Sequence, residues 1–475
     1  MRVDGDRLWR SLMDMARIGA TDKGGVCRLA LSDLDREGRD LFVEWCEAAG
    51  CAVTVDRIGN IFARREGRDS SLPPILTGSH LDTQPTGGKF DGAYGVLAGL
   101  EVIRALNDHG VATDAAVEVC VWTNEEGSRF APTMMGSGVF AGVLDLDEIY
   151  RKVDEDGKKL GDELTRIGYA GAVQPGRRDI RTYFEAHIEQ GPMLEAGNKT
   201  VGVVTGAQGL RWHDVVIAGQ ESHAGTTPMP RRKDALAAAA ALVLEIERIG
   251  HSYAPGACAT CGGFRVHPGS RNSIPGRVRV QSDMRHPDDA ALESMDAEVR
   301  AACRKIADER CVTIEITEIM RDAATQFDEA CVKSVREAAR GSGYSHCDIV
   351  SGAAHDAIHL AKVAPSGMIF IPCKDGISHN EAESATKEDC EAGCQVLYDA
   401  VIRAATGPGD HLAQPCSPGL RYAPAGPAGP KPAPDSLIGG GPLNGGRPRK
   451  AALCRSKRST SLAKSERERE RRSTL

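Results

Sequence analysis

The stretch "GSHLDTQPTGGKFDGAYG", residues 78–95, sets one histidine and two aspartates among glycines, threonines and a proline. Taken alone, His80, Asp82 and Asp91 would be read as solvated loop residues. Their surroundings argue otherwise, because "PPILTGS" before His80 is typical of a short buried strand and "GVLAGLEVIRALNDHG" after Asp91 has helical periodicity. A strand, a polar loop and a helix in this order predict an α/β sheet with chemistry at its strand ends.

The neighbouring segments extend this pattern. "SDLDREGRDLFVEWCEAAG" (32–50) predicts a helix that begins at Ser32 and closes on a glycine. "AVTVDRIGNIFARREG" (52–67) predicts two strands that turn at Gly59-Asn60. "AAVEVCVWTNEEGSRF" (115–130) is apolar and β-branched until it meets a pair of glutamates, so a further strand is expected to end in polar residues.

A second module is expected from Gly209. It contains the strands "WHDVVIAG", "GRVRVQSDMRHP" and "CVTIEITEI" and two long helices, over 231–250 and 288–309. We therefore expect a catalytic domain over 1–208 and 322–406 that is interrupted by a small α+β sandwich, 209–321. From Gly407 the composition turns to Pro, Gly and Ser and then to basic residues, which predicts a disordered basic tail over 407–475.

The composition limits the classes of function. The 475 residues are 41% hydrophobic and 26% charged, as in ordinary soluble proteins, and the formal net charge of -7 argues against a general nucleic-acid binder. Only the tail, with 13 Lys/Arg against 5 Asp/Glu, could suggest such binding. The longest apolar run is half the length of a membrane span, and no secretory signal is recognisable. Fifteen scattered cysteines, with a single CxxC and no second pair for zinc, favour a reducing compartment, so a cytoplasmic protein is expected.

A set of imidazoles and carboxylates stands at predicted strand ends or in glycine-rich turns. Its members are His80, Asp82, Asp91, Glu125, Glu126, His187 in "EAHIEQGP" and His379 in "GISHNEAE". Three imidazoles, a carboxylate able to bridge and a further carboxylate suit a pair of zinc-like or manganese-like ions. Two such ions can polarise a carbonyl group, and a spare carboxylate beside a ligand suits a general base.

With these motifs, residues 5–405 resemble the hydantoinase and carbamoylase branch of the two-metal M20 peptidase-like hydrolases. The matching motifs are "GSHLDTQPTGGKFDG", "NEEGSRF", "AHIEQGP", "GQESHAGTTPM", "RNSIPG" leading to "DMRHP", "SGAAHDA" and "SHNEAE". The fold that this resemblance implies is α/β, with a two-metal exopeptidase-like catalytic domain and an inserted α+β sandwich dimerisation domain.

The resemblance implies a role for each matching residue. His80 and His187 would bind metal, Asp91 would bridge the ions, and Glu126 and His379 would complete the second ion's ligands. Zinc or manganese is expected, and cobalt or nickel would also suit this donor set. The catalytic residues would be Glu125, as the base that activates water, and Asp82, which would hold the other ring nitrogen of His80.

Substrate contacts are implied at Gln190, His223, Asn272 and Arg285, where a guanidinium suits a substrate carboxylate. The insert would form a homodimer in which His223 completes the partner's site. The family usually has glycine where this chain has Ala354, so a methyl group would crowd the backbone there or forbid a positive φ, and could narrow the substrate range.

The resemblance implies hydrolysis of a carbamoyl or ureido C–N bond in an N-carbamoyl-L-amino acid, with release of the amino acid, ammonia and carbon dioxide. Allantoate amidohydrolase and β-ureidopropionase are the alternatives within the same class. A metal-binding scaffold without turnover is the alternative from another class. It predicts that the catalytic carboxylates are missing, whereas Glu125 and Asp82 are both present. A small-molecule substrate, with neither nucleic acid nor membrane as a partner, is therefore expected.

Overall fold

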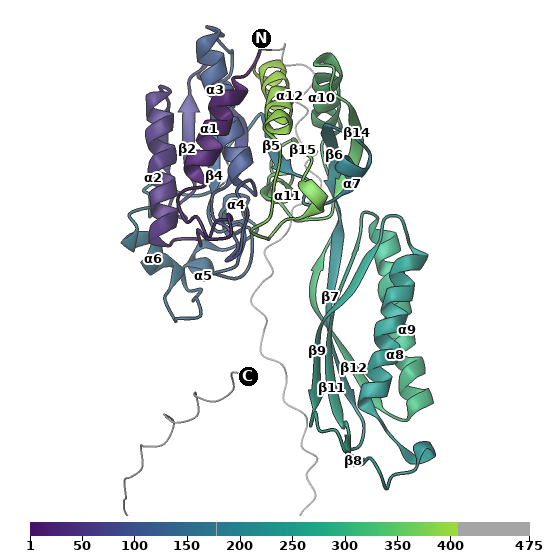
Figure 1. Cartoon of the computed structure of the whole chain (residues 1–475). Coiled ribbons are helices and arrows are strands. Elements are labelled where there is room, and N and C mark those ends of the chain that lie inside the picture. Colours follow the sequence, from purple (N-terminus) through teal and green to yellow (C-terminus); the bar gives the residue numbers. More distant parts are fainter. Residues whose placement is uncertain (177, 407–475) are drawn as a thin grey trace, which may run out of the picture. The chain divides into compact units, whose positions relative to one another are not determined.

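The structure is a computed structural model that describes residues 1–176 and 178–406, so the predicted tail lies outside the described residues. Two hydrophobic cores form, each against a sheet of its own. The larger core belongs to a nine-stranded mixed sheet and the smaller core to a four-stranded antiparallel sheet (Figure 1).

The large sheet carries the stretch around His80. Its strands run in the order β1 (Ala52–Val55), β2 (Ile61–Arg65), β4 (Val117–Trp122), β3 (Ile75–His80), β5 (Thr182–Ile188), β15 (Ser366–Ile371), β6 (Val201–Ala207) and β13 (Thr325–Gln326), and β14 (His346–Ser351) also pairs with β6. The central strands β4, β3, β5 and β15 are mutually parallel. They are buried along their whole length, which explains their largely apolar sequences.

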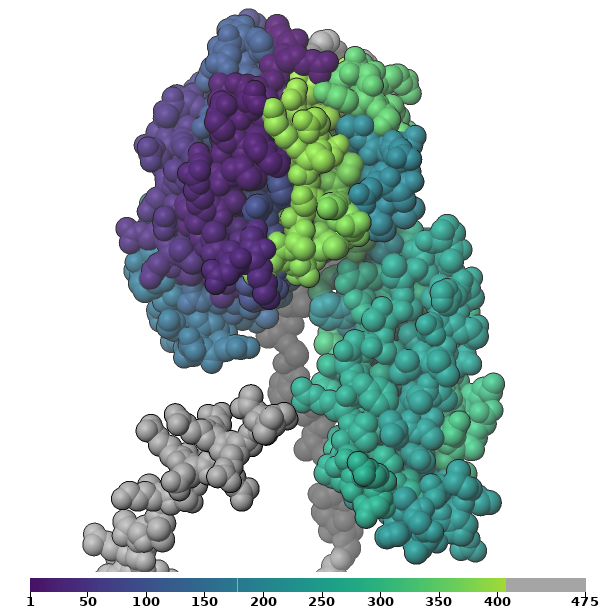
Figure 2. Space-filling model, in the orientation of Figure 1, coloured from purple at the N-terminus to yellow at the C-terminus, as the bar shows by residue number. Residues whose placement is uncertain are grey.

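Long helices pack against this sheet and against one another. They are α1 (Gly5–Met15), α3 (Ala93–Asp108), α10 (Glu329–Gly341) and α12 (Lys387–Thr406), while α2 (Asp33–Ala48) packs against β1 and β2. The shorter helices are α4 (Met135–Phe140), α5 (Leu146–Tyr150), α6 (Leu160–Arg166), α7 (Met193–Ala196), α11 (Asp356–Leu360) and the 3-10 turn η2 (Lys374–Gly376). The first and last helices of the described chain lie side by side, as Figure 2 shows in purple and yellow-green.

The four-stranded sheet runs in the order β12 (Thr313–Asp322), β7 (Gly209–Ala218), β11 (Arg277–His286) and β9 (Cys258–His267). Two helices, α8 (Ala235–Ser252) and α9 (Asp289–Arg310), cover one face and bury residues such as Val215, Leu242 and Val299. A small pair of strands, β8 (Ser222–His223) and β10 (Ser273–Ile274), and the 3-10 turn η1 (Met229–Arg231) complete this unit. The α+β sandwich expected from the sequence is therefore present.

Most of the expected elements occur where the sequence placed them. The helix that follows Ser32 is capped as predicted, because the Ser32 hydroxyl accepts the main-chain N–H of Asp35 at 3.1 Å. The edge strand β9 was not expected. It contains the CxxC pair and Gly262-Gly263, which weaken a strand pattern, and it is irregular where Gln281 and Ser282 of β11 pair with it.

Within the described residues, no helix is long and apolar enough to cross a membrane. None of the cysteines in that part of the chain forms a disulfide.

Candidate active site

The candidate metal ligands gather at one edge of the large sheet. His80 is the last residue of β3, His187 lies near the end of β5, and Glu126 follows β4. Asp91 precedes α3 and His379 lies in the loop after β15. Because the parallel strands β3, β4, β5 and β15 all end at this edge, residues far apart in the sequence meet there.

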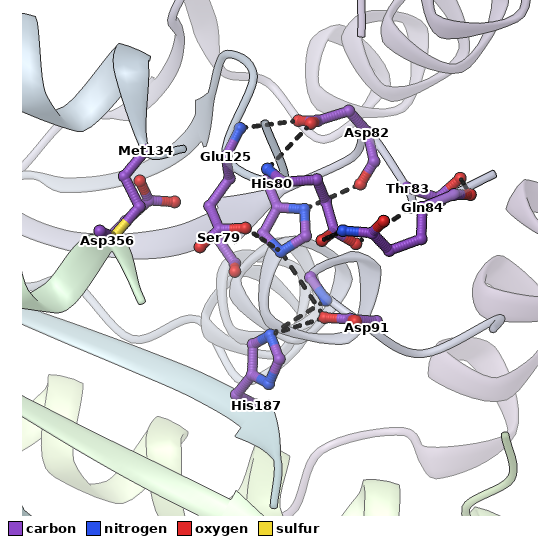
Figure 3. A network of polar contacts seen from close by, with 12 residues as sticks. Ser79, His80, Asp82, Thr83, Gln84, Asp91, Glu125, Met134, His187 and Asp356 are labelled. Carbon is purple, nitrogen blue, oxygen red and sulfur yellow. Dashed lines mark hydrogen bonds and ion pairs between the residues drawn. The ribbon is translucent and has the colours of Figure 1, made fainter. Parts of the chain in front are cut away.

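Asp91 contacts three of the other candidate ligands, and Figure 3 shows its contacts with His80 and His187. Its Oδ1 is 3.7 Å from Nε2 of His80 and 3.2 Å from Nε2 of His187. Its Oδ2 is 3.3 Å from Nε2 of His379, which in turn is 3.5 Å from Oε2 of Glu126. Two sets of three potential ligands thus share one carboxylate, as expected for a bridging residue between two ions.

The histidine tautomers fit this interpretation. Nδ1 of His80 is 2.9 Å from the main-chain oxygen of Asp82, and Nδ1 of His187 is 2.9 Å from the main-chain oxygen of Ile188. A carbonyl oxygen can only accept, so Nδ1 carries a proton in both rings, and Nε2 is the ring atom that faces Asp91. Two electron-rich atoms facing each other at this distance require a cation or a proton between them, so the donor set suits divalent metal.

The pKa values describe the competition between proton and metal. Burial disfavours the charged form of His187, but the hydrogen bond to Asp91 and the charge of Asp91 outweigh it and raise its pKa to about 9. Burial lowers the pKa of His80 to about 4. Burial would raise the pKa of Asp91, yet its contacts with His187 and His379 hold that pKa well below 3.8. A metal ion bound by His187 would therefore have to displace a proton from it.

Glu125 lies beside the metal ligands without joining their two sets. Its Oε2 is 3.4 Å from Nε2 of His80, and the residue is 8% exposed. Burial, followed by the negative charges of Asp356, Glu126 and Asp82, raises the pKa of Glu125 well above 4.5. A carboxylate with a raised pKa next to the ligands can accept a proton from water and later donate it.

Asp82 differs in detail from the prediction. Its side chain was expected to hold the imidazole of His80, but the main-chain oxygen of Asp82 makes that contact. The carboxylate turns the other way and accepts the main-chain N–H groups of Glu125 and Glu126, each at 3.2 Å. Asp82 therefore contacts both sides of the site. Its main-chain oxygen orients the ring of His80, and its carboxylate orients the main chain of the two glutamates.

Gln190, a predicted substrate contact, lies within the group. Its Nε2 donates to Oδ2 of Asp91 at 3.0 Å and to the Ser378 hydroxyl at 3.2 Å. Its φ of 56°, like the 52° of His379 and the 54° of Asn124, falls in the left-handed region that non-glycine residues rarely adopt. Such strained backbone is concentrated at functional sites.

Arg285 has partners of its own. Its Nε lies 3.1 Å from Oδ1 of Asp283, its Nη2 donates to Oδ2 of Asp283 at 2.8 Å, and its Nη1 donates to the main-chain oxygen of Gly352 at 2.8 Å. One edge of the guanidinium thus binds Asp283, and each terminal nitrogen keeps one further N–H. A substrate carboxylate would have to bind along this other edge.

His223 and Asn272 are neighbours on the β8–β10 pair. The N–H of Ala224, next to His223, donates to the main-chain oxygen of Asn272 at 2.9 Å, and both predicted contacts are exposed. Among the described residues, no hydrogen bond or ion pair links either side chain to the metal-ligand group. The structure therefore brings these two residues to each other but not to that group.

Ala354 is exposed and does not have a positive φ. The strain considered for a methyl group at this position is therefore absent. Its effect on the substrate range remains a prediction.

A buried polar network around Glu185, next to His187, was not predicted from the sequence. Glu185 accepts from the hydroxyls of Ser79 at 2.7 Å and Tyr183 at 3.0 Å, and from the main-chain N–H of Ala357 at 3.0 Å. Ser137 donates to the neighbouring carboxyl group of Asp356. The signal was present, since Glu185 is an acid inside an apolar strand, two residues before His187 and on the same face.

Two sets of histidine and carboxylate side chains share one aspartate here, and a further buried glutamate lies beside them. This arrangement is typical of metal-dependent hydrolases. The family model described as peptidase family M20/M25/M40 matches residues 76–403. The chain therefore belongs to this family, and the resemblance seen in the motifs is confirmed, as is the expected α/β fold with its α+β sandwich.

Three comparisons define the neighbourhood within the family. An N-carbamoyl-L-amino-acid amidohydrolase of Rhizobium meliloti is 48% identical over 85% of this chain and 97% of its own length. An allantoate amidohydrolase of Bacillus subtilis is 34% identical over 82% of this chain and 95% of its own length. The crystal structure of an amidase of the hydantoinase/carbamoylase family from Burkholderia multivorans matches with a TM-score of 0.84 and 59% sequence identity. The match covers 86% of this chain and 99% of that one.

Proposed function

We propose that this protein hydrolyses the carbamoyl C–N bond of an N-carbamoyl-L-amino acid and releases the amino acid, ammonia and carbon dioxide. The observation that carries the proposal is the position of Asp91 between two sets of ligands, with Glu125 beside them. The comparisons favour this substrate class, because the relative named for it is more similar than the relative named for allantoate.

In this proposal each ion has its own ligands. His80 and His187 would hold one ion, His379 and Glu126 the other, and Asp91 both. When bound, divalent ions supply Lewis acidity toward a carbonyl group and make water acidic enough to lose a proton near neutral pH. Zinc or manganese fits the nitrogen and oxygen donors, and cobalt or nickel would be accepted as well.

The protein's own groups would handle the proton and the substrate. Glu125 takes the proton of the attacking water and passes it to the leaving nitrogen. Gln190 lies close enough to Asp91 to contact a bound carbamoyl group. Arg285, already oriented by Asp283 and Gly352, presents its remaining N–H groups to the carboxylate of the substrate.

We also propose that residues 1–208 and 322–406 form the catalytic domain and that the insert, 209–321, forms a homodimer. The exposure of His223 and Asn272, and their lack of contacts with the metal-ligand group, are what a dimer would require if they complete the partner's site. A cytoplasmic location also belongs to this proposal, because the scattered cysteines of the sequence favour a reducing compartment.

An assay of ammonia release tests the proposal. The substrates are N-carbamoyl-L-methionine, N-carbamoyl-β-alanine and allantoate, offered to the metal-loaded protein whose ion content has been measured. Turnover of the first compound above the other two is expected. Activity on allantoate alone, or on N-carbamoyl-β-alanine alone, would replace our choice with the corresponding alternative.

A scaffold that binds metal without turnover is the competing function. It predicts full metal content and no release of ammonia from any of the three compounds. The presence of Glu125 argues against it, because a scaffold has no use for a buried base next to its ligands.

A further inference from the structure

The carboxylate of Glu383 connects two loops that bear candidate ligands. Its Oε1 accepts the main-chain N–H groups of Phe90 at 3.0 Å and Asp91 at 3.1 Å. Its Oε2 accepts the hydroxyl of Ser378 at 2.9 Å. The side chain is 4% exposed, so water competes little for these hydrogen bonds.

Both loops need such support. Asp91 must direct its two oxygens toward different histidines, and His379 has a φ of 52°, which costs about 1 kcal/mol or more in a non-glycine residue. Ser378, directly before His379, is also 3.5 Å from Oδ2 of Asp91. Glu383 and Ser378 therefore fix the separation between Asp91 and His379.

Gly88 makes room for this carboxylate. A Cβ atom at position 88 would lie 2.0 Å from Oε1 and 2.1 Å from Cδ of Glu383. The φ of Gly88 is not positive, so the absence of a side chain, and not an unusual backbone conformation, is what this position requires. The loop of Asp91 is thus shaped to admit Glu383.

We propose that Glu383 is a positioning residue for the second ion, the one assigned to Asp91, Glu126 and His379. The proposal rests on the two-ion site proposed above. Residues that hydrogen-bond to metal ligands commonly change metal affinity about 10- to 100-fold when they are mutated. Glu383 makes such hydrogen bonds to two loops, the loop of Asp91 and the loop of Ser378 and His379.

The test measures metal binding without any substrate. Full-length wild type and the variants Glu383→Ala, Glu383→Gln and Glu383→Asp are titrated with Zn²⁺ against a competing chelator, and bound zinc is counted by elemental analysis. We expect Glu383→Ala to bind the second zinc about 10- to 100-fold more weakly, with a smaller loss at the first zinc, which shares Asp91 but not the Ser378–His379 loop. Glu383→Gln, which keeps an acceptor oxygen for the two N–H groups, should recover part of the loss.

Glu189 provides a matched control. It is buried and also accepts two successive main-chain N–H groups, those of Met193 at 2.7 Å and Leu194 at 2.8 Å, but it contacts none of the candidate ligands. Glu189→Gln should therefore bind both zinc ions like wild type. An equal loss in Glu189→Gln and Glu383→Gln would overturn the proposal, because any buried carboxylate would then have the same effect.

Gly88→Ala provides a second route in case Glu383→Ala does not fold. The new methyl group should displace Glu383 and weaken the second zinc in the same way. Unchanged affinity in both Gly88→Ala and Glu383→Gln would refute the positioning role. Failure of the proposed function gives a different result, because a protein that binds two zinc ions without releasing ammonia would leave the metal titrations intact.

Discussion

The carboxylate of Asp82 accepts the main-chain N–H groups of Glu125 and Glu126, each at 3.2 Å. One residue thereby fixes the peptide that carries two neighbouring glutamates with different tasks. Glu126 is directed toward His379, and Glu125 toward His80. Adjacent, chemically identical side chains can therefore be told apart by experiment.

Glu125→Gln is expected to keep both metal ions and to lose turnover. The amide cannot accept the proton of water, whereas all five candidate ligands remain, so kcat should fall about 10²- to 10⁴-fold. Glu126→Gln is the control and should lose metal as well as activity. Steady-state kinetics with elemental analysis of the same samples measure both effects. Wild-type turnover in Glu125→Gln would contradict its role as the base.

Arg285→Lys is expected to raise KM for carboxylate substrates by roughly tenfold, with a smaller change in kcat. The ammonium group of a lysine is a point charge and lacks the planar fork that binds Asp283 and the oxygen of Gly352 and still leaves an edge for a substrate carboxylate. Arg279→Lys is a suitable control, since Arg279 pairs with Asp214 on the same sheet, away from Gly352. If the two variants gave the same KM, Arg285 would not be the carboxylate anchor.

Metal-free protein should lose stability as the pH rises from 7 to 9. Burial and then the charge of Asp91 raise the pKa of Glu126 to about 8, while that of His187 is raised to about 9 against the effect of burial. A group whose pKa is raised by folding stabilises the protein at low pH and loses this effect as the pH passes the folded value. Thermal unfolding in the presence of a chelator should show the decline, and metal-loaded protein should not. A flat profile in chelator would contradict it.

Subunit mixing tests whether His223 serves the partner's site. His223→Ala and Glu125→Gln are each expected to be nearly inactive as homodimers. In a mixed dimer, the subunit that carries His223→Ala keeps its own Glu125 and receives His223 from its partner. Activity should therefore return when the two variants are dissociated and reassociated together. No recovery, with mixed dimers demonstrated by mass spectrometry, would show that His223 does not act across a dimer.

The sequence predicted that the candidate ligands would lie close together, because each stands at the end of a strongly apolar strand or in a glycine-rich turn. His80, Asp91, His187 and His379 meet for that reason, since parallel strands bring their carboxyl ends to one edge. The edge strand β9 was missed because two adjacent glycines and a β-bulge hide its alternation.

The details of hydrogen bonding could not be predicted in the same way. A spacing of two residues, as between His80 and Asp82, does not reveal whether a carbonyl or a carboxylate faces the ring. Arg285 and Glu383 each have a partner from a segment far away in the sequence, Gly352 and Phe90 respectively, and these contacts depend on packing that no local pattern records. The resemblance implies a role for each residue, whereas the structure shows the hydrogen-bond partners of each side chain.

The sheet edge that gathers the ligands draws on segments that are almost 300 residues apart in the sequence, from His80 to His379. A growing polypeptide on the ribosome would carry His80, Asp91 and His187 long before His379 and Glu383 had been translated. A product that terminates between these segments would therefore lack His379, one of the three side chains assigned to the second ion, and with it the proposed activity.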